Sequence, residues 1–179
     1  DVKGILHSHS RWTDGAHSLV SMVETAREIG LEYLGISDHF LSEIHPDGLD
    51  LDAARVQRQE VNRLRENFSN FDIFQGIEID VSDDGSLRVD NTTLDLFDYV
   101  IASFPDNGNA DDEALVKRVV IAAANPKITI LGKPVGDFML SGCDRLAGME
   151  KVLKAAAAGG KAVELNANTN CETIDWTCC

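Results

Sequence analysis

Short apolar segments alternate with amphipathic segments along most of the chain. Isoleucine, valine, leucine and phenylalanine dominate the apolar segments, which predicts strands at 3–8, 32–37, 71–79, 98–103, 128–131 and 162–167. The longer segments carry apolar residues at helical spacing or are rich in alanine, which predicts helices between Ser18 and Gly30 and at 50–68, 111–124 and 145–158. Strands and helices that alternate in this way are typical of a parallel α/β sheet or barrel.

The first two predicted helices indicate which positions should be buried. Ser18 is a typical N-cap residue and Gly30 a typical helix stop. The inner positions of the first helix are Leu19, Val23, Ala26 and Ile29. Those of the second helix include Leu51, Ala54, Val61 and Leu64. No repeat or low-complexity segment interrupts the alternation, so we expect a single domain over residues 1–179.

The charge of the chain limits the partners that it can bind. It has 30 acidic and 16 basic residues and a formal net charge of −14, an unfavourable field for nucleic acid or anionic lipid. A polyanion must therefore be bound through local cations or a metal ion. No window approaches the roughly 20 apolar residues of a membrane span and no signal peptide is evident, so we expect no membrane association and a cytoplasmic location.

The cysteines and the two ends of the chain indicate the redox state of the thiols and the origin of the domain. Cys143, Cys171, Cys178 and Cys179 are expected to be reduced thiols, because a chain with this many core residues needs no disulfide scaffold and adjacent cysteines are a poor zinc spacing. The chain begins with Asp1 rather than methionine and ends within a segment that has an amphipathic pattern. We therefore expect it to be a domain cut from a longer protein.

Polar side chains gather where the predicted strands end. In α/β barrels and open sheets, this rim is where active sites are built. The residues are His7, His9, Asp38, His39, Glu78, Ser103, Lys133, Asn166 and Asn168.

His7 and His9 are separated by one residue, so on a strand their imidazoles point to the same side, as two ligands of one metal ion would. Imidazole nitrogens and carboxylate oxygens suit zinc, manganese or iron, and a carboxylate can bridge two ions that activate water for attack on phosphorus. His7, His9 and Glu78 form one such set, and Asp14 with His39 forms a second.

Each of these residues also has a structural interpretation. Exposed histidines are common, and Asp14 followed by glycine is an ordinary turn. Asp38 could cap the segment after its strand, and Glu78 lies in a core-like run where a buried carboxylate needs a partner. Their shared position at strand ends favours a common site.

The chain contains six motifs in this order: HSHSRWTDG, GISDH, GIEID, YVIASF, ILGKPVG and ELNAN. Together they resemble the motifs of the PHP (polymerase and histidinol phosphatase) superfamily. The resemblance covers nearly the whole chain and is strongest to the PHP domain at the carboxyl end of bacterial family X DNA polymerases. It implies a distorted, TIM-like (β/α)7 barrel with up to three metal ions at the carboxyl rim. By matching motifs, His7, His9 and Glu78 would bind the first ion, Glu78 would bridge to the second, and Asp14 and His39 would serve the third.

The chain departs from the family pattern at several ligand positions. Pro105 and Lys133 stand where the family has histidines, and Asp137 and Cys171 stand where it has arginines. The last family motif, which supplies two further ligands, is expected beyond residue 179, so the barrel should end before its last strand. One or two ions at most are therefore expected.

The resemblance implies a metal-dependent phosphoesterase that acts on phosphoester substrates, for example as a 3′-5′ exonuclease or 3′ end-processing activity on DNA ends beside a polymerase. Glu78, Asp38 and Lys133 are the candidate catalytic residues, and the missing ligands imply impaired activity. The alternative is a non-catalytic structural or interaction module. With either function, the open sheet edge should be paired with a partner, covered by residues 173–179, or leave the chain poorly stable alone. An amidohydrolase-like metalloenzyme is less consistent with the motif order.

Substitutions at Lys133 test whether the missing histidines limit the number of metal ions that the chain binds. A protonated ammonium cannot ligate a metal, so we expect Lys133 to replace the middle cation and to pair with Glu78 or a substrate phosphate; a solvent-directed side chain is the alternative. Lys133→His alone should recruit no further ion, because Pro105 still denies that ion a second histidine. Lys133→His with Pro105→His should bind one more manganese or zinc ion in calorimetric titration. An extra ion already bound beside Lys133 in the unmodified chain would contradict this expectation.

Overall fold

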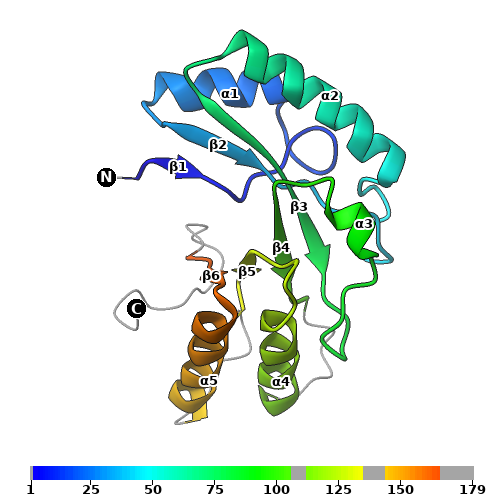
Figure 1. Ribbon diagram of the computed structural model, residues 1–179, viewed down its shortest axis with the longest axis vertical. Coiled ribbons are helices and arrows are strands. Elements are labelled where there is room, and N and C mark those ends of the chain that lie inside the picture. Colours follow the sequence, from blue (N-terminus) through cyan, green and yellow to red (C-terminus); the bar gives the residue numbers. More distant parts are fainter. Residues whose placement is uncertain (1, 106–111, 135–143, 166–179) are drawn as a thin grey trace. The chain divides into compact units, whose positions relative to one another are not determined.

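The computed structural model describes residues 2–105, 112–134 and 144–165, in which strands and helices alternate (Figure 1). The elements are β1 (Gly4–Ile5), α1 (Leu19–Glu28), β2 (Tyr33–Ile36), α2 (Leu51–Asn67), β3 (Asp72–Asp80), α3 (Asn91–Leu94), β4 (Tyr99–Ser103), α4 (Asp112–Ala123), β5 (Ile130–Gly132), α5 (Asp144–Gly159) and β6 (Ala162–Val163). The strands follow chain order, β1-β2-β3-β4-β5-β6, and the pairs β1/β2, β2/β3, β4/β5 and β5/β6 are parallel. The predicted parallel α/β fold is therefore confirmed; α3 was not predicted.

The contacts divide the chain into two compact units. The first comprises residues 1–79 and 90–100, and the second comprises residues 80–89 and 101–179. Strands β3 and β4 contribute residues to both units. No helix in the described ranges is long and apolar enough to cross a membrane.

The first unit buries the inner faces of α1 and α2 against β2 and β3. Its core consists of Leu19, Val23, Ala26, Leu34, Ile36, Val61, Leu64, Phe71 and Ile73. Ser18 caps α1 as predicted, because its side chain accepts from the backbone N–H of Ser21. The expectation for Ile29 is wrong: it is the C-cap residue and is 67% exposed. Gln57 in α2, which was not predicted, is fully buried; it donates to Asp38 and accepts from Gln75.

The second unit has its own apolar core. Helices α4 and α5 pack side by side (Figure 1). The core residues are Val81, Ala102, Phe104, Val116, Val119, Ala122, Ala123, Ile128, Leu131, Met149, Val152 and Ala156.

The predicted first strand is longer than the regular ladder, which ends at Ile5. The next residues still follow β2, but through mixed hydrogen bonds: the Ser37 N–H donates to the Ser8 carbonyl (2.8 Å), and the Ser8 hydroxyl donates to the Gly35 carbonyl (2.7 Å). These two bonds, one between backbone groups and one from the Ser8 side chain, keep this segment beside β2 outside the regular pairing. The segment that carries His7 and His9 is thus fixed.

The side chain of Tyr99 leaves no room for a Cβ atom at two glycines of the first unit. Its hydroxyl donates to the Leu6 carbonyl, and its side chain is buried. A Cβ atom on Gly76 would lie 2.2 Å from Tyr99 Cζ, and one on Gly35 would lie 2.3 Å from the Tyr99 hydroxyl oxygen. The ring therefore lies directly on the backbone of β2 and β3, where only glycine leaves room.

We expect Gly76→Ala to destabilise the chain by about 1–3 kcal/mol, because the new methyl group overpacks against Tyr99. In a Tyr99→Ala background the same change should be close to neutral, because the clash is gone. Equilibrium urea unfolding of the two single variants and the double variant measures this coupling. An equal cost in both backgrounds would show that the ring does not impose glycine at position 76.

Candidate metal centre

Glu78 lies inside β3 and is surrounded by imidazoles. Its Oε2 atom is 3.2 Å from His7 Nε2, 3.1 Å from His9 Nε2 and 3.2 Å from His39 Nδ1. The side chain is only 6% exposed. Backbone contacts fix this arrangement: the Glu78 N–H donates to the Asp38 carbonyl, and the Phe40 N–H donates to the Glu78 carbonyl. His39 and Glu78 are thereby held side by side as a parallel bridge.

Two of these buried atoms need a further partner. Glu78 Oε2 and His39 Nδ1 are buried and find no hydrogen-bond partner of acceptable geometry within the described residues. A buried carboxylate oxygen in this state is costly unless another group compensates it. Imidazole nitrogens and a carboxylate oxygen that converge on one point are the donor set that a divalent cation binds.

A second cluster lies beside the first and shares His9. His9 Nδ1 is 2.7 Å from Asp14 Oδ1, and His39 Nε2 is 3.8 Å from Asp14 Oδ2. The ligand atoms within each cluster, His7 with His9 and Glu78, and His9 with Asp14 and His39, lie within 4.8 Å of one another. The structure thus brings together all five sequence-predicted metal residues. His9 and His39 can each offer one ring nitrogen toward Glu78 and the other toward Asp14.

The electrostatics keep both carboxylates in the form that a metal binds. Burial alone would raise the pKa of Glu78, but the His7, His9 and His39 imidazoles hold it well below its usual range. Burial would likewise raise the pKa of Asp14, but His9 lowers it. For His9, burial lowers the pKa, and the stronger combined effect of Glu78 and Asp14 raises it. The pKa of His39 is lowered by burial and by the neighbouring His9 and His45.

Asp38 fixes the loop that carries His9 and Asp14. Its carboxylate is fully buried and accepts from the Ser10 N–H (2.7 Å), the Ser10 hydroxyl (2.6 Å), the Thr13 hydroxyl (2.6 Å) and Gln57 Nε2 (2.6 Å). Four donors occupy the acceptor capacity of a carboxylate. These contacts support a positioning role, and a direct catalytic role for Asp38 stays a prediction.

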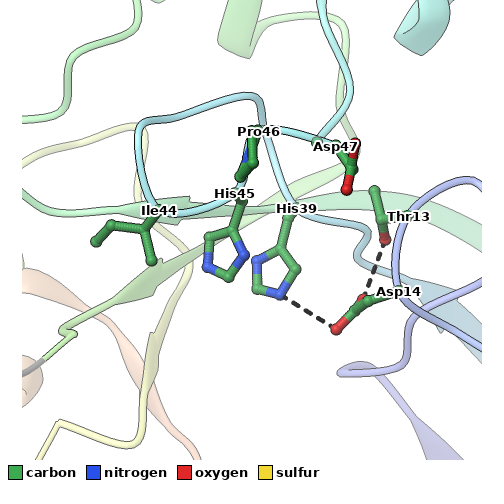
Figure 2. Close-up of a pocket in the computed structure, with 8 residues that line it drawn as sticks. Thr13, Asp14, His39, Ile44, His45, Pro46 and Asp47 are labelled. Atoms are coloured by element: carbon green, nitrogen blue, oxygen red, sulfur yellow. Dashed lines mark hydrogen bonds and ion pairs between the residues drawn. The ribbon is translucent and has the colours of Figure 1, made fainter.

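A small cavity adjoins the second cluster. It has a volume of about 190 Å³ and is lined by Thr13, Asp14, His39 and residues 44–48 (Figure 2). The His45 ring stacks on the His39 ring, with centroids 3.5 Å apart and planes inclined by 11°. His45 was missed in the sequence, where the only signal is a histidine in the turn-like HPDG segment after His39.

The other predicted site residues belong to the second unit or lie outside the described residues. Lys133 follows β5, is exposed and has a positive φ of 44°, and its backbone N–H donates to Glu164 Oε2 (3.1 Å). Its pairing with Glu78 stays a prediction. Ser103 ends β4, and Pro105 follows it. Outside the described residues lie Asp137, Cys143, Asn166, Asn168, Cys171, Cys178, Cys179 and the segment 173–179.

No family model matches the chain. The chain is 33% identical over 167 residues to the DNA polymerase/3′-5′ exonuclease PolX of Bacillus subtilis (strain 168); the match covers 93% of this chain and 29% of that protein. The chain therefore spans less than a third of the length of this relative. Among solved structures, it resembles histidinol phosphate phosphatase from Lactococcus lactis subsp. lactis Il1403, complexed with zinc, L-histidinol and phosphate. That match has a TM-score of 0.67 and 22% identity, and covers 93% of this chain and 74% of the phosphatase chain. This second likeness shows a shared fold.

The shared position of His9 predicts a graded loss of metal. His9→Ala should remove a ligand from both clusters and lower the affinity for zinc or manganese by at least about 100-fold, since even changes to residues around a ligand cost roughly 10–100-fold. His7→Ala should affect one ion only. Metal content after dialysis, measured by mass spectrometry, compares these variants with His17→Ala, a control at an exposed histidine outside both clusters. Unchanged metal content in His9→Ala would rule out this assignment.

Proposed function

We propose that this chain, which belongs to the PHP superfamily, is a metal-dependent phosphoesterase domain. The observation that carries the proposal is the convergence of three imidazole nitrogens on one oxygen of the buried Glu78. The relatives support the reaction class, because one is a polymerase and exonuclease and the other is a phosphatase.

The residues present fit divalent metal ions. His7, His9 and Glu78 would hold one ion, and His9, Asp14 and His39 would hold a second. Nitrogen and carboxylate ligands suit zinc, manganese or iron. A bound ion would supply the positive charge that stabilises a phosphoryl group during displacement. With a formal net charge of −14, the chain needs such a charge to attract a phosphoester.

The protein's own groups keep Glu78 ionised and position His9 and Asp14 to bind a metal ion. Glu78 stays ionised because the imidazoles around it hold its pKa low. Asp38 binds the Ser10–Thr13 segment and so fixes the loop that positions His9 and Asp14. Because Asp38 also accepts from Gln57 of α2, this loop is tied to the core of the first unit.

The finer assignment is hydrolysis of phosphodiesters at DNA 3′ ends, as a 3′-5′ exonuclease or end-processing activity in a polymerase context. The match to a protein named as both a polymerase and a 3′-5′ exonuclease supports this substrate class. We further propose that residues 1–179 act as one PHP domain in the cytoplasm.

A non-catalytic PHP module is the second candidate. It is favoured by Pro105 and Lys133, which stand at positions where the family motifs carry histidines. Neither side chain, as a proline or a protonated lysine, can ligate a metal. Such a module would retain one or two ions for structure and would associate through its sheet edge.

A substrate screen separates the two candidates. The metal-loaded chain should hydrolyse bis(p-nitrophenyl) phosphate and remove nucleotides from the 3′ end of a labelled single-stranded oligonucleotide. EDTA should abolish both reactions, and Glu78→Gln should reduce them to background; circular dichroism checks that the variant is folded. His17→Ala serves as the matched control, since it lies outside both clusters. Full metal content without hydrolysis of any phosphoester would instead support the non-catalytic module.

A further inference from the structure

The segment from Phe40 to Leu49 forms a closed loop that presents His45 to the metal centre. Its ends are joined by hydrogen bonds from the Leu41 N–H to the Leu49 carbonyl (2.9 Å) and from the Leu49 N–H to the His39 carbonyl (2.8 Å). A Cβ atom on Gly48 would lie 2.7 Å from the Leu41 nitrogen, so the two arms approach as closely as a glycine allows. The loop therefore has a defined path.

Within this loop the backbone of His45 is fixed on both sides. Its N–H donates to the Ser42 hydroxyl (3.1 Å), and its carbonyl accepts from the N–H groups of Ser42 (3.2 Å) and Gly48 (3.0 Å). Its ring stacks face to face on His39 (Figure 2). The imidazole of His45 is thus placed on the wall of the cavity that also holds His39 and Asp14.

The cavity has the size and lining for a phosphoryl group. Its volume of about 190 Å³ is below the roughly 300–1,000 Å³ of sites that enclose a whole drug-sized ligand. It fits a phosphoryl group and the first atoms of an esterified alcohol. Asp14 and His39, which line it, belong to the second metal cluster. The ring of His45 stacks on that of His39, and the apolar Ile44 and Pro46 line the same cavity.

Resting on the phosphoesterase function proposed above, we infer that this cavity binds the substrate phosphoryl group and that His45 donates a hydrogen bond to one of its non-bridging oxygens. An imidazole ring carries an N–H donor in both its neutral and its protonated form. Ile44, which is 49% exposed, and Pro46 would contact the carbon skeleton of the esterified alcohol.

Asp47 provides a second test, in which a substitution should strengthen phosphate binding rather than weaken it. It lines the same cavity and is exposed. Its negative charge opposes a phosphate bound next to it, so removal of that charge should tighten phosphate binding. Glu43 lies in the same loop but does not line the cavity, and Glu43→Gln therefore makes the same change in net charge away from the proposed ligand.

The test is calorimetric titration of inorganic phosphate into the zinc-loaded full chain and its variants, with metal content measured for each. His45→Phe keeps a ring that can stack on His39 but has no donor. It should retain zinc and bind phosphate about tenfold or more weakly, the loss typical of a hydrogen bond to a charged group. His45→Gln should recover part of the affinity. Asp47→Asn should bind phosphate about twofold to fivefold more tightly, and Glu43→Gln should bind it as the unmodified chain does.

The outcomes separate this inference from the proposed function. Phosphate binding by zinc-replete His45→Phe at the unmodified affinity would overturn the His45 contact. Equal effects of Asp47→Asn and Glu43→Gln would overturn the location of the phosphate in this cavity. A zinc-replete chain that binds no phosphate would overturn the inference, while the phosphoesterase screen would still decide the function. A chain that takes up no metal would contradict both.

Discussion

The site depends on an ionised carboxylate held inside the sheet. Glu78 is 6% exposed, yet its pKa is held below the usual range because three imidazole nitrogens lie within 3.2 Å of one of its oxygens. A neutral imidazole can donate to this oxygen through a ring N–H or bind a cation through its other nitrogen. A divalent cation would accept lone pairs from Glu78, His7 and His9 at once.

A second buried carboxylate makes this arrangement possible without taking part in it. Asp38 binds Ser10 and Thr13 on one side and Gln57 on the other. The first contact closes the loop between His9 and Asp14, and the second ties that loop to α2. Two neighbouring acidic residues of similar burial therefore have different roles. Asp38 is surrounded by hydroxyl, amide and backbone donors, whereas Glu78 is surrounded by imidazoles, which can also bind a metal ion.

Much of this could be predicted from the sequence, because local patterns determine it. The alternation of apolar and amphipathic segments indicated the parallel α/β fold, and the one-residue spacing of His7 and His9 indicated imidazoles on a common side. The helical spacing of apolar residues wrongly placed Ile29 on the buried face of α1, since spacing alone does not show where a helix ends. The sharing of His9 between two clusters and the stacking of His45 on His39 depend on loop paths. Bonds between residues 28 and 19 positions apart help to fix those paths, and no local pattern reports them.

X-ray absorption spectroscopy of the zinc-loaded chain tests the central claim most directly, because the ligand set proposed here contains no sulfur while the chain has four cysteines. A zinc ion bound by His7, His9 and Glu78 should show only nitrogen and oxygen neighbours at about 2.0–2.2 Å. It should also show the outer-shell scattering of two imidazole rings. A sulfur shell at about 2.3 Å would place the ion on cysteine thiolates and would contradict the assignment of the Glu78 cluster as the metal centre.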